Sequence, residues 1–278
     1  MFSIIIPTWN NLDMLRLCVE SIRQNSTYEH QIVLHINEGA DGTQKWADTE
    51  GVAYTVSPTN IGICHAVNLA FGKAEKGYIM YLNDDMYVLP DWDKYLVDEI
   101  KNIGNQSFML SATMIEPRPS TAKNTIVADY GRDVAVFQKE KLLAEFRNYN
   151  MSNWSGASWP PLVVSRESWL AIGGFSIEFS PGMYSDPDFS MKLWLIGCRI
   201  FKGIGASRVY HFQAKSTGRI KKNNGRLQFM KKWGIPASFF YKNYLAMGEP
   251  YAGERTEPEA NLELKWAKWK ARFHAFLK

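Results

Sequence analysis

Cysteine is scarce in this chain. The three cysteines, Cys18, Cys64 and Cys198, lie far apart in the sequence and form no C-x-x-C pair. A disulfide framework or a cysteine-based zinc cluster requires grouped or paired cysteines. The sequence therefore argues against both kinds of stabilisation and fits a reducing compartment.

Long hydrophobic runs are also lacking. No segment approaches the ~20 consecutive apolar residues that a membrane-spanning helix needs, and no basic region precedes the apolar residues 2–6. We therefore expect a cytoplasmic protein with no transmembrane helix. Hydrophobic residues make up 46% and charged residues 22%, which is typical of a globular chain. The 278 residues suffice for one large domain, or for one domain with an appendage.

Acidic residues do not outnumber basic residues in this chain, but the two kinds are unevenly distributed along it. The formal net charge is +4, yet residues 213–278 carry 14 Lys and Arg against 5 Asp and Glu, whereas residues 1–212 carry 18 against 23. The basic end either faces an anionic partner or is simply solvated. We expect no nucleic-acid partner.

Short apolar segments alternate with helix-period segments in the first half of the chain. This alternation is typical of an α/β fold in which crossover helices join parallel strands. Ligands of such open sheets bind beyond the carboxyl ends of the strands, so the turns that follow the strands are candidate sites. The predicted strands are Phe2–Pro7, Gln31–Asn37, Val52–Ser57, Tyr78–Asn83 and Phe108–Ile115.

Helical spacing predicts two of the crossover helices. Apolar residues recur at this spacing over residues 12–22, where Asn10 and Asn11 can cap the helix, and over residues 66–74. Residues 116–159 show no such period and are rich in Pro, Asn, Ser and Trp, which is consistent with a long functional loop or excursion. Further on, we expect a helix that ends at Gly173, a helix that begins near Asp186 and a strand over Arg208–Phe212.

Two adjacent acids, Asp84 and Asp85, follow the fourth predicted strand. Carboxylate oxygens at the carboxyl end of a buried strand are suitable ligands for Mg²⁺ or Mn²⁺, which also bind substrate phosphates. From these residues alone, a turn with two solvated acids is the alternative. His211 ends a later apolar strand and is another candidate ligand, although a lone histidine is more often structural.

A second acid pair, Asp186 and Asp188, brackets Pro187 at a predicted helix start. A carboxylate held beside an acceptor hydroxyl can act as a general base. The alternative is that Ser185 or Asp186 merely caps the helix, with Pro187 in its first turn.

The order of these motifs along the chain resembles the nucleotide-binding half of family 2 glycosyltransferases. The resemblance covers residues 1–217 and implies the GT-A fold, a Rossmann-like, mostly parallel sheet with flanking helices, and an inverting transfer. Residues 1–116 and 117–217 would be its nucleotide-donor and acceptor halves, and residues 218–278 a basic, helical C-terminal extension. The motifs that carry the resemblance are Pro7-Thr8-Trp9-Asn10, Asn37-Glu38-Gly39-Ala40-Asp41-Gly42-Thr43, Asn60-Ile61-Gly62 with Asn68, Asn83-Asp84-Asp85, Gly173-Gly174-Phe175 and Ser185-Asp186-Pro187-Asp188.

The resemblance also implies roles for single residues. Asp85 matches the last acid of the family's D-x-D metal motif, whereas Asn83 replaces the first acid. Asp186 matches the acid of the family's E-D pair and would be the general base, while Ser185 replaces the glutamate. His211 would join Asp85 as a ligand of Mn²⁺ or Mg²⁺. The residues implied to contact the nucleotide are Pro7, Thr8, Asn10, Asn37, Glu38, Asn60, Gly62, Asn68, Asn83, Asp84 and Lys215.

The implied activity is transfer of a hexosyl or N-acetylhexosaminyl group from a nucleotide diphosphate sugar, with uridine as the expected base, to a hydroxyl of a glycan or lipid-linked acceptor. The cation and Lys215 would neutralise the charge that grows on the leaving diphosphate, and Asp186 would remove the acceptor proton. Two alternatives stay open. A sugar-nucleotide nucleotidyltransferase would need a Gly-rich basic loop, which residues 7–11 lack. A non-catalytic carbohydrate-binding protein of the same fold is suggested by Asn83 and Ser185.

Two aromatic segments each have a functional and a packing interpretation. Trp159, in the segment Trp154–Pro161, can stack on an acceptor sugar, which Asp188 would also contact, but core packing of the tryptophan is equally consistent. An aromatic stripe with interspersed Lys and Arg occupies residues 260–278, as in a helix that makes peripheral contact with an anionic membrane. The alternative is that the stripe docks on the body of the protein or on another subunit. The stripe consists of Leu262, Trp266, Trp269, Phe273 and Phe276.

Overall fold

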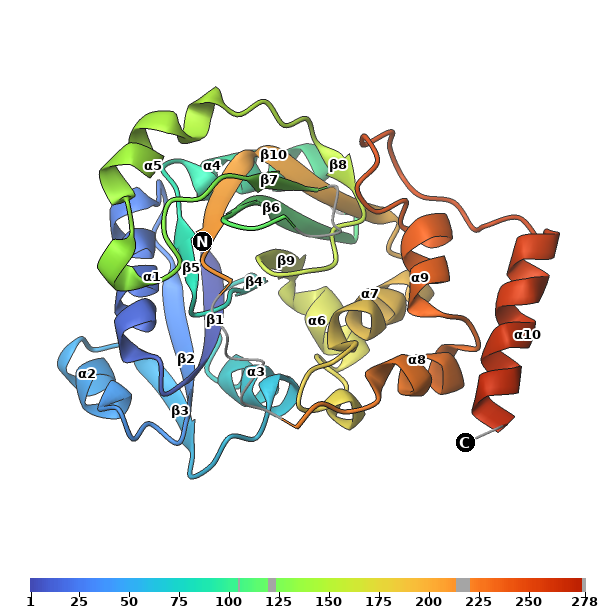
Figure 1. Ribbon diagram of the computed structural model, residues 1–278, viewed down its shortest axis with the longest axis horizontal. Helices are drawn as coiled ribbons and strands as arrows, with labels where there is room; N and C mark the ends of the chain where they lie inside the picture. The colour runs from blue at the N-terminus through green and yellow to red at the C-terminus, as the bar shows by residue number, and fades with distance from the viewer. Residues whose placement is uncertain (105, 120–123, 214–220, 277–278) are drawn as a thin grey trace.

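The computed structural model describes residues 1–104, 106–119, 124–213 and 221–276. Their strands form one sheet in the order β3-β2-β1-β4-β9-β6-β10-β5, in which β7 also pairs with β6 and β8 with β10. Helices cover both faces of this sheet (Figure 1). The strands are β1 (Phe2–Trp9), β2 (Gln31–Asn37), β3 (Ala53–Ser57), β4 (Tyr78–Tyr81), β5 (Met86–Val88), β6 (Phe108–Glu116), β7 (Thr125–Val127), β8 (Trp154–Ser155), β9 (Leu162–Ser165) and β10 (Ile200–His211).

The half of the sheet built from β1 to β4 is parallel, as the sequence predicts. β1 pairs in parallel with β2 and with β4, and β2 pairs in parallel with β3. The register places Trp9 opposite Asn37, and Asn37 opposite Ser57. Because these strands end together, the side chains that follow them meet at one edge of the sheet. The other half is mixed, since β9 runs antiparallel to β4 and β6, and β5 runs antiparallel to β10.

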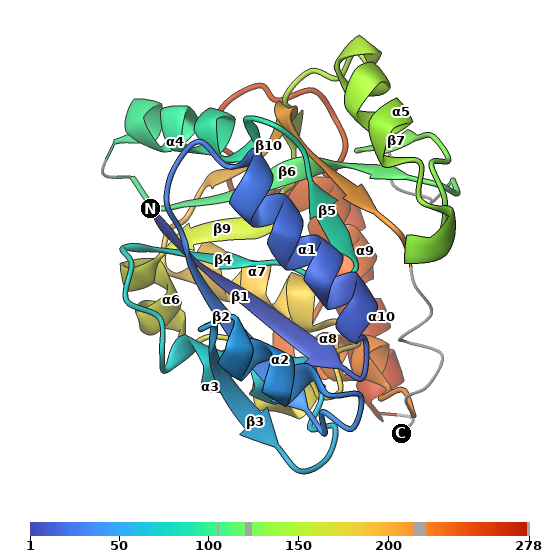
Figure 2. The ribbon, with the colours of Figure 1, turned by 90° about the vertical axis from the view of Figure 1, so that its left-hand side faces the viewer.

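The helices divide between the two faces of the sheet. Figure 2 shows α1 and α2 in front of β1, β2 and β3, with α3, α6 and α7 on the far side. Each face buries an apolar cluster, one around Leu15 and Leu96 and the other around Val67 and Phe189. The helices are α1 (Leu12–Asn25), α2 (Thr43–Thr49), α3 (Ile63–Phe71), α4 (Trp92–Ile103), α5 (Lys139–Glu145), α6 (Arg166–Ile172), α7 (Ser185–Leu195), α8 (Gly225–Trp233), α9 (Ala237–Phe239) and α10 (Leu262–Phe276), with a π-helical turn η5 (Phe240–Tyr244) and short 3-10 turns η1 (Val134–Val136), η2 (Phe146–Asn148) and η3 (Ile177–Phe179).

The start of α1 differs from the expected local cap. The side chain of Asn11 makes no capping hydrogen bond. Instead, the Leu12 N–H donates to Oδ2 of Asp41, at 2.8 Å. Asn10 accepts a hydrogen bond from the Ala40 N–H, at 2.9 Å. The loop after β2 therefore caps the helix after β1, with an acid at the positive end of the helix dipole.

The segment from 116 to 159 is more ordered than the sequence indicates. It contains β7, α5 and β8, and three of its side chains, Tyr130, Leu142 and Phe146, are buried in a third apolar cluster with Tyr210 of β10. The expected loop or excursion therefore carries short helices and strands of its own, joined by irregular chain. These side chains are buried by contacts with distant parts of the chain, which the local sequence pattern does not show.

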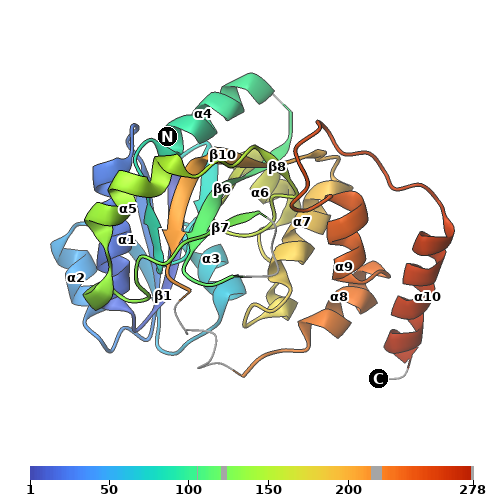
Figure 3. The same cartoon turned by 45° about the horizontal axis from the view of Figure 1, so that its top comes forward.

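The C-terminal helices pack on the same body. Phe229 of α8 and Phe240 of η5 are buried in the apolar cluster that also holds Phe189 of α7. The expected boundary between residues 217 and 218 lies outside the described residues. Figure 3 shows α8 and α9 beside α7, with α10 at the edge of the molecule. No helix among the described residues has the length and apolar character to cross a bilayer.

α10 docks with the face opposite to the aromatic stripe. Leu264, Ala267 and Ala271 are its buried residues, and the helix packs on α8. The aromatic stripe is exposed, so the expectation that it docks on the body of the protein is wrong. The side chain of Phe276 lies outside the described part of the chain. The exposed stripe residues are Leu262, Trp266, Trp269 and Phe273.

Candidate active site

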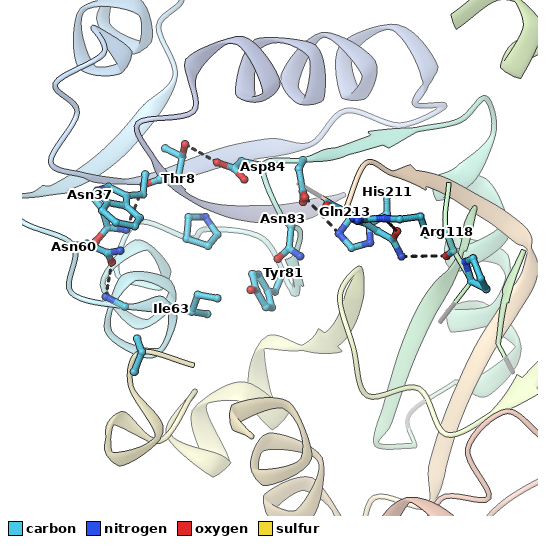
Figure 4. Close-up of a pocket in the computed structure, with 16 residues that line it drawn as sticks. Thr8, Asn37, Asn60, Ile63, Tyr81, Asn83, Asp84, Arg118, His211 and Gln213 are labelled. Atoms are coloured by element: carbon cyan, nitrogen blue, oxygen red, sulfur yellow. Dashed lines mark hydrogen bonds and ion pairs between the residues drawn. The ribbon is translucent and has the colours of Figure 1, made fainter. Parts of the chain in front are cut away.

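A cavity of about 620 Å³ opens at the carboxyl edge of β1, β2 and β4 (Figure 4). This is the edge at which ligands of open α/β sheets bind. The cavity brings together turns that are far apart in the sequence, including most of the residues predicted to contact a nucleotide. Its lining residues are Pro7, Thr8, Trp9, Asn37, Asn60, Gly62, Ile63, Tyr81, Asn83, Asp84, Asp85, Arg118, Pro119, Pro181, His211 and Gln213.

Asn37 holds one wall of the cavity together. Its amide nitrogen donates to the Thr8 carbonyl at 3.3 Å, and its Oδ1 accepts from the Ile61 N–H at 2.9 Å. The Asn60 Oδ1 accepts from the Gly62 N–H at 2.9 Å, so the loop before α3 is fixed by two asparagines. Hydrogen bonds between backbone and amide groups therefore hold this wall of the cavity in a fixed shape.

Gly62 allows this loop to pack against the loop before α7. Its φ is +79°, and a Cβ here would lie 2.4 Å from Oγ of Ser180 and 2.6 Å from Cα of Pro181. The next residue, Ile63, donates its N–H to the Pro181 carbonyl at 2.9 Å. A glycine is therefore required by both the backbone conformation and the close approach. The contact brings the N-terminus of α7 toward the cavity.

Asn10 and Glu38 stand behind the cavity wall. Glu38 Oε2 accepts hydrogen bonds from Nε1 of Trp9, at 2.7 Å, and from Nδ2 of Asn10, at 3.2 Å. Neither Asn10 nor Glu38 lines the cavity, whereas Trp9 does. In this arrangement Glu38 holds the Trp9 ring, and Asn10 holds the Glu38 carboxylate.

The sequence predicts that Asn68 lies along the nucleotide, but in the structure its amide binds the backbone of Phe175. Its Nδ2 donates to the Phe175 carbonyl at 2.7 Å, and its Oδ1 accepts from the Phe175 N–H at 2.8 Å. Asn68 does not line the cavity. With both amide atoms used in this way, it fastens the loop between α6 and α7 to α3.

Three titratable side chains meet where β5, β6 and β10 come together. Nε2 of His211 lies 3.5 Å from Oδ2 of Asp85, and Nδ1 of His211 lies 2.8 Å from Oε1 of Glu116. Asp84 points the other way and accepts a hydrogen bond from Oγ1 of Thr8 at 2.8 Å. Figure 4 shows Thr8 and Asp84 on one side of Asn83 and His211 on the other. The two adjacent acids thus have different partners.

The electrostatics of His211 follow from these contacts. Burial disfavours a charged ring, but Asp85 and Glu116 outweigh it and raise the pKa of His211 to about 10. Without a cation the ring is therefore an imidazolium between two carboxylates. Among the described residues, no set of three His, Cys, Asp or Glu side chains is placed to enclose a metal ion. The geometry nevertheless fits a cation shared with a diphosphate, because Asp85 and Nε2 of His211 face the cavity edge while Glu116 orients the ring through Nδ1.

Asp186 lies at the second position of α7, half-buried. Among the described residues, no hydrogen bond or ion pair reaches its carboxylate, and burial raises its pKa to about 7. Burial and then this carboxylate raise the pKa of Tyr81 and of Tyr241. Asp186 therefore lies near Tyr81, which lines the cavity, although Asp186 itself does not. A carboxylate that titrates near neutral pH is suited to proton transfer.

Asp188 lies on the other side of α7. It is fully buried, and its Oδ1 lies 2.8 Å from Nζ of Lys232 and accepts a hydrogen bond from Nε1 of Trp233 at 2.9 Å. A carboxylate without exposed surface cannot contact an acceptor in this conformation. The expected acceptor contact is therefore replaced by an ion pair that ties α7 to α8.

Trp159 lies beside a residue that the sequence did not single out. Its Nε1 donates to the Tyr241 hydroxyl at 3.1 Å, and the two rings meet edge to face at 5.9 Å between centroids. Neither ring lines the cavity. The Asp186 carboxylate nevertheless lies close enough to Tyr241 to raise the pKa of its hydroxyl. The two aromatic residues therefore belong to the neighbourhood of Asp186.

The cavity wall also contains a cation, Arg118, that is not among the residues predicted from the sequence. Arg118 donates from Nε to Oε1 of Gln213 at 3.1 Å and from Nη2 to the Gln213 carbonyl at 3.0 Å. This clamp joins the end of β6 to the segment after β10, next to His211. Arg118 lies in a stretch without period, so no local signal could have identified it. The predicted contact Lys215 lies outside the described residues.

Comparison with known proteins identifies the family. Residues 3–157, more than half of the chain, match glycosyl transferase family 2. The chain belongs to this family. A curated relative of this family 2 chain, the uncharacterized protein y4gI of Sinorhizobium fredii, is 25% identical over 246 residues, which cover 83% of the chain and 26% of the relative. The chain therefore spans about a quarter of that protein's length.

Solved structures share the fold of this family 2 chain. TarS 1–349 of S. aureus in complex with UDP-GlcNAc has a TM-score of 0.58 at 13% identity, covering 84% of the chain and 65% of that protein. GalNAc-T7 with UDP, GalNAc and Mn²⁺ has a TM-score of 0.57 at 16% identity, covering 81% of the chain and 44% of that protein. The predicted α/β fold of GT-A type is confirmed by these neighbours.

Proposed function

We propose that this chain is an inverting glycosyltransferase that moves a hexosyl or N-acetylhexosaminyl group from a UDP-sugar to a hydroxyl of a glycan or lipid-linked acceptor. The observation that carries the proposal is one cavity in which the Asn37–Asn60 wall faces Asp85 and His211, with Asp186 near by. Family membership and the nucleotide sugars named for the structural neighbours support the choice of donor.

The nucleoside end of the donor would lie against the wall formed by Pro7, Thr8, Asn37 and Asn60. Backbone groups and amides are rigid there because Asn37 joins β1 to the loop before α3. Trp9 offers an aromatic face, held in place by Glu38. An aromatic face supplies stacking, and fixed polar groups supply selectivity for one base.

The diphosphate end would lie beside Asp85 and His211. A bound Mn²⁺ or Mg²⁺ would neutralise the negative charge that develops on the departing nucleotide. Asp85 and Nε2 of His211 would hold the cation, and Glu116 would fix the histidine tautomer. The Arg118 guanidinium lines the same end of the cavity, so it would add a second positive charge for the diphosphate.

Asp186 would act as the general base. Its carboxylate has no competing partner among the described residues, and its pKa of about 7 leaves it largely ionised in mildly alkaline solution. The acceptor hydroxyl would give its proton to Asp186 as the hydroxyl oxygen attacks the anomeric carbon and the bond to the diphosphate breaks. One displacement inverts the configuration. Trp159 and Tyr241, close to this carboxylate, would form the acceptor wall.

A thermal-shift panel tests the proposal. A ligand that binds only the folded state raises the apparent stability. We expect UDP with Mn²⁺ to raise Tm more than GDP, dTDP or CMP with Mn²⁺, and more than UDP alone. Release of UDP from a UDP-sugar would then separate the classes of function. Pyrophosphate-dependent turnover would indicate a nucleotidyltransferase, and binding without turnover would indicate a carbohydrate-binding protein.

A further inference from the structure

The exposed face of α10 is strongly aromatic. Leu262 is 82% exposed, Trp266 61%, Trp269 52% and Phe273 48%. The three rings stack on one another, with centroids 4.7 Å apart for Trp266 and Trp269 and 5.4 Å apart for Trp269 and Phe273. Singly exposed apolar residues are ordinary, but a continuous ladder of large rings marks a surface that is covered by a partner.

Helix geometry places cations on both sides of this ladder. At 100° per residue, Lys265 and Arg272 lie on one flank of the ladder, and Lys270 lies on the other. Lys265 and Arg272 are exposed, and Lys270 is half-buried. Glu263, the acid of this helix, pairs with Lys242 at 2.8 Å. Among the described residues, Lys265, Lys270 and Arg272 therefore have no ion-pair partner.

The docking of α10 fixes which way the ladder faces. The small residues Ala267 and Ala271, together with Leu264, are buried on the opposite side, against α8. The helix start is capped, since Oδ1 of Asn261 accepts from the Leu264 N–H at 3.0 Å. The ladder therefore points away from the protein, and Figures 1 and 3 show α10 at the outer edge of the molecule.

We propose that this face of α10, formed by Leu262, Trp266, Trp269 and Phe273 with Lys265, Lys270 and Arg272 beside them, binds the surface of an anionic lipid bilayer. Aromatic rings enter the boundary between headgroups and acyl chains, and the flanking cations pair with anionic headgroups. A second copy of the chain fits less well. It would bring the cationic flanks together, and four side chains are few against the roughly 20–30 residues that each partner of a stable interface contributes.

Vesicle sedimentation of the full chain tests this proposal without any need for catalysis. We expect the protein to sediment with vesicles of equal parts phosphatidylglycerol and phosphatidylcholine, and much less with phosphatidylcholine alone. A triple variant, called the aromatic variant, replaces the rings by serine: Trp266→Ser, Trp269→Ser and Phe273→Ser. Its partition coefficient into the anionic vesicles should be lower by roughly tenfold for each ring removed. Lys265→Gln and Arg272→Gln should weaken it by about fivefold each, because a basic residue at an anionic surface contributes ~1 kcal/mol.

A matched control variant replaces three exposed apolar residues elsewhere, Leu170→Ser, Ile177→Ser and Leu195→Ser, which are 59%, 55% and 66% exposed. This variant should sediment as the parent does. Because all the replaced side chains are exposed, each variant should keep the parent's Tm within about 2 °C, consistent with small effects at surface positions.

The proposal is overturned if the parent fails to sediment with anionic vesicles, or if the aromatic and control variants bind them equally well. It is also overturned if light scattering finds a dimeric parent and a monomeric aromatic variant that still binds vesicles, since a second copy would then cover the ladder. Quenching of tryptophan fluorescence by brominated acyl chains, lost with Trp266 and Trp269, is the expected confirmation.

Discussion

Replacing Asp186 by asparagine should separate binding from chemistry. Asparagine keeps the size of the side chain but cannot accept the proton of the acceptor hydroxyl. We expect turnover to fall by at least about 10²-fold, within the 10²–10⁴-fold range of general-base assistance, while donor affinity stays within a few-fold. Donor affinity is preserved because Asp186 does not line the cavity. Release of UDP from the donor sugar and thermal shifts by UDP with Mn²⁺ measure the two quantities.

The structure adds a stability signature to this prediction. The pKa of Asp186 in the folded protein, about 7, lies above its ordinary value of 3.8 because burial disfavours the charge. The parent therefore loses stability as the pH rises from about 4 to 7, and the loss is complete above pH 7. The uncharged amide of the Asp186→Asn variant avoids this loss. Discounted for partial exposure, the gain at pH 8 should be about 1–2 kcal/mol, or roughly 2–8 °C in Tm, and should vanish near pH 4.

Asp188→Asn is the matched control, two residues away on the same helix. It removes one of the two acids paired with Lys232, which is partly exposed and keeps its ion pair with Glu178 at 2.7 Å. We therefore expect the free energy of unfolding to fall by only about 1–2 kcal/mol, with a measurable rate in the folded protein. Turnover of Asp186→Asn within tenfold of the parent would refute the assignment of the base. Loss of turnover in folded Asp188→Asn alone would move the assignment to Asp188.

Three further predictions concern the pH dependence, the cation and the loops. In the parent, kcat/KM should rise tenfold per pH unit up to about pH 7 and then level off, because Asp186 must be ionised to accept a proton, and the Asp186→Asn variant should lack this rise. Asp85→Ala should keep the parent's fold but lose the part of the UDP-induced thermal shift that depends on Mn²⁺, and an unchanged shift would remove Asp85 from the cation site. Gly62→Ala should lower Tm and weaken UDP binding together, since the added Cβ meets Ser180 and Pro181, whereas Gly77→Ala, with open space around its Cβ, should do neither. Equal behaviour of the two glycine variants in thermal unfolding would contradict the close-packing argument.

The positions of the early strands and of the motifs after them could be predicted from the sequence. A parallel strand buried on both faces is a short apolar run, and the polar residues that follow it must lie at the carboxyl edge of the sheet. Each of Thr8, Asn37 and Asp85 lies at or just after the end of a predicted strand, and in the structure all three line one cavity. The same logic predicted β2 with its observed bounds, Gln31–Asn37.

Roles that depend on distant partners were decided by the tertiary structure. Asn68 and Phe175 are 107 positions apart, and only their contact shows that the amide fastens a loop. Asp188 is committed to Lys232 and Trp233 because α8 packs against α7. The periodicity of α10 identifies its aromatic stripe, but the small residues on the other side determine which face docks. A local sequence pattern determines which residues share a helix face or a strand end. Whether those residues are buried, and which groups they bond to, depends on the distant segments that pack against them.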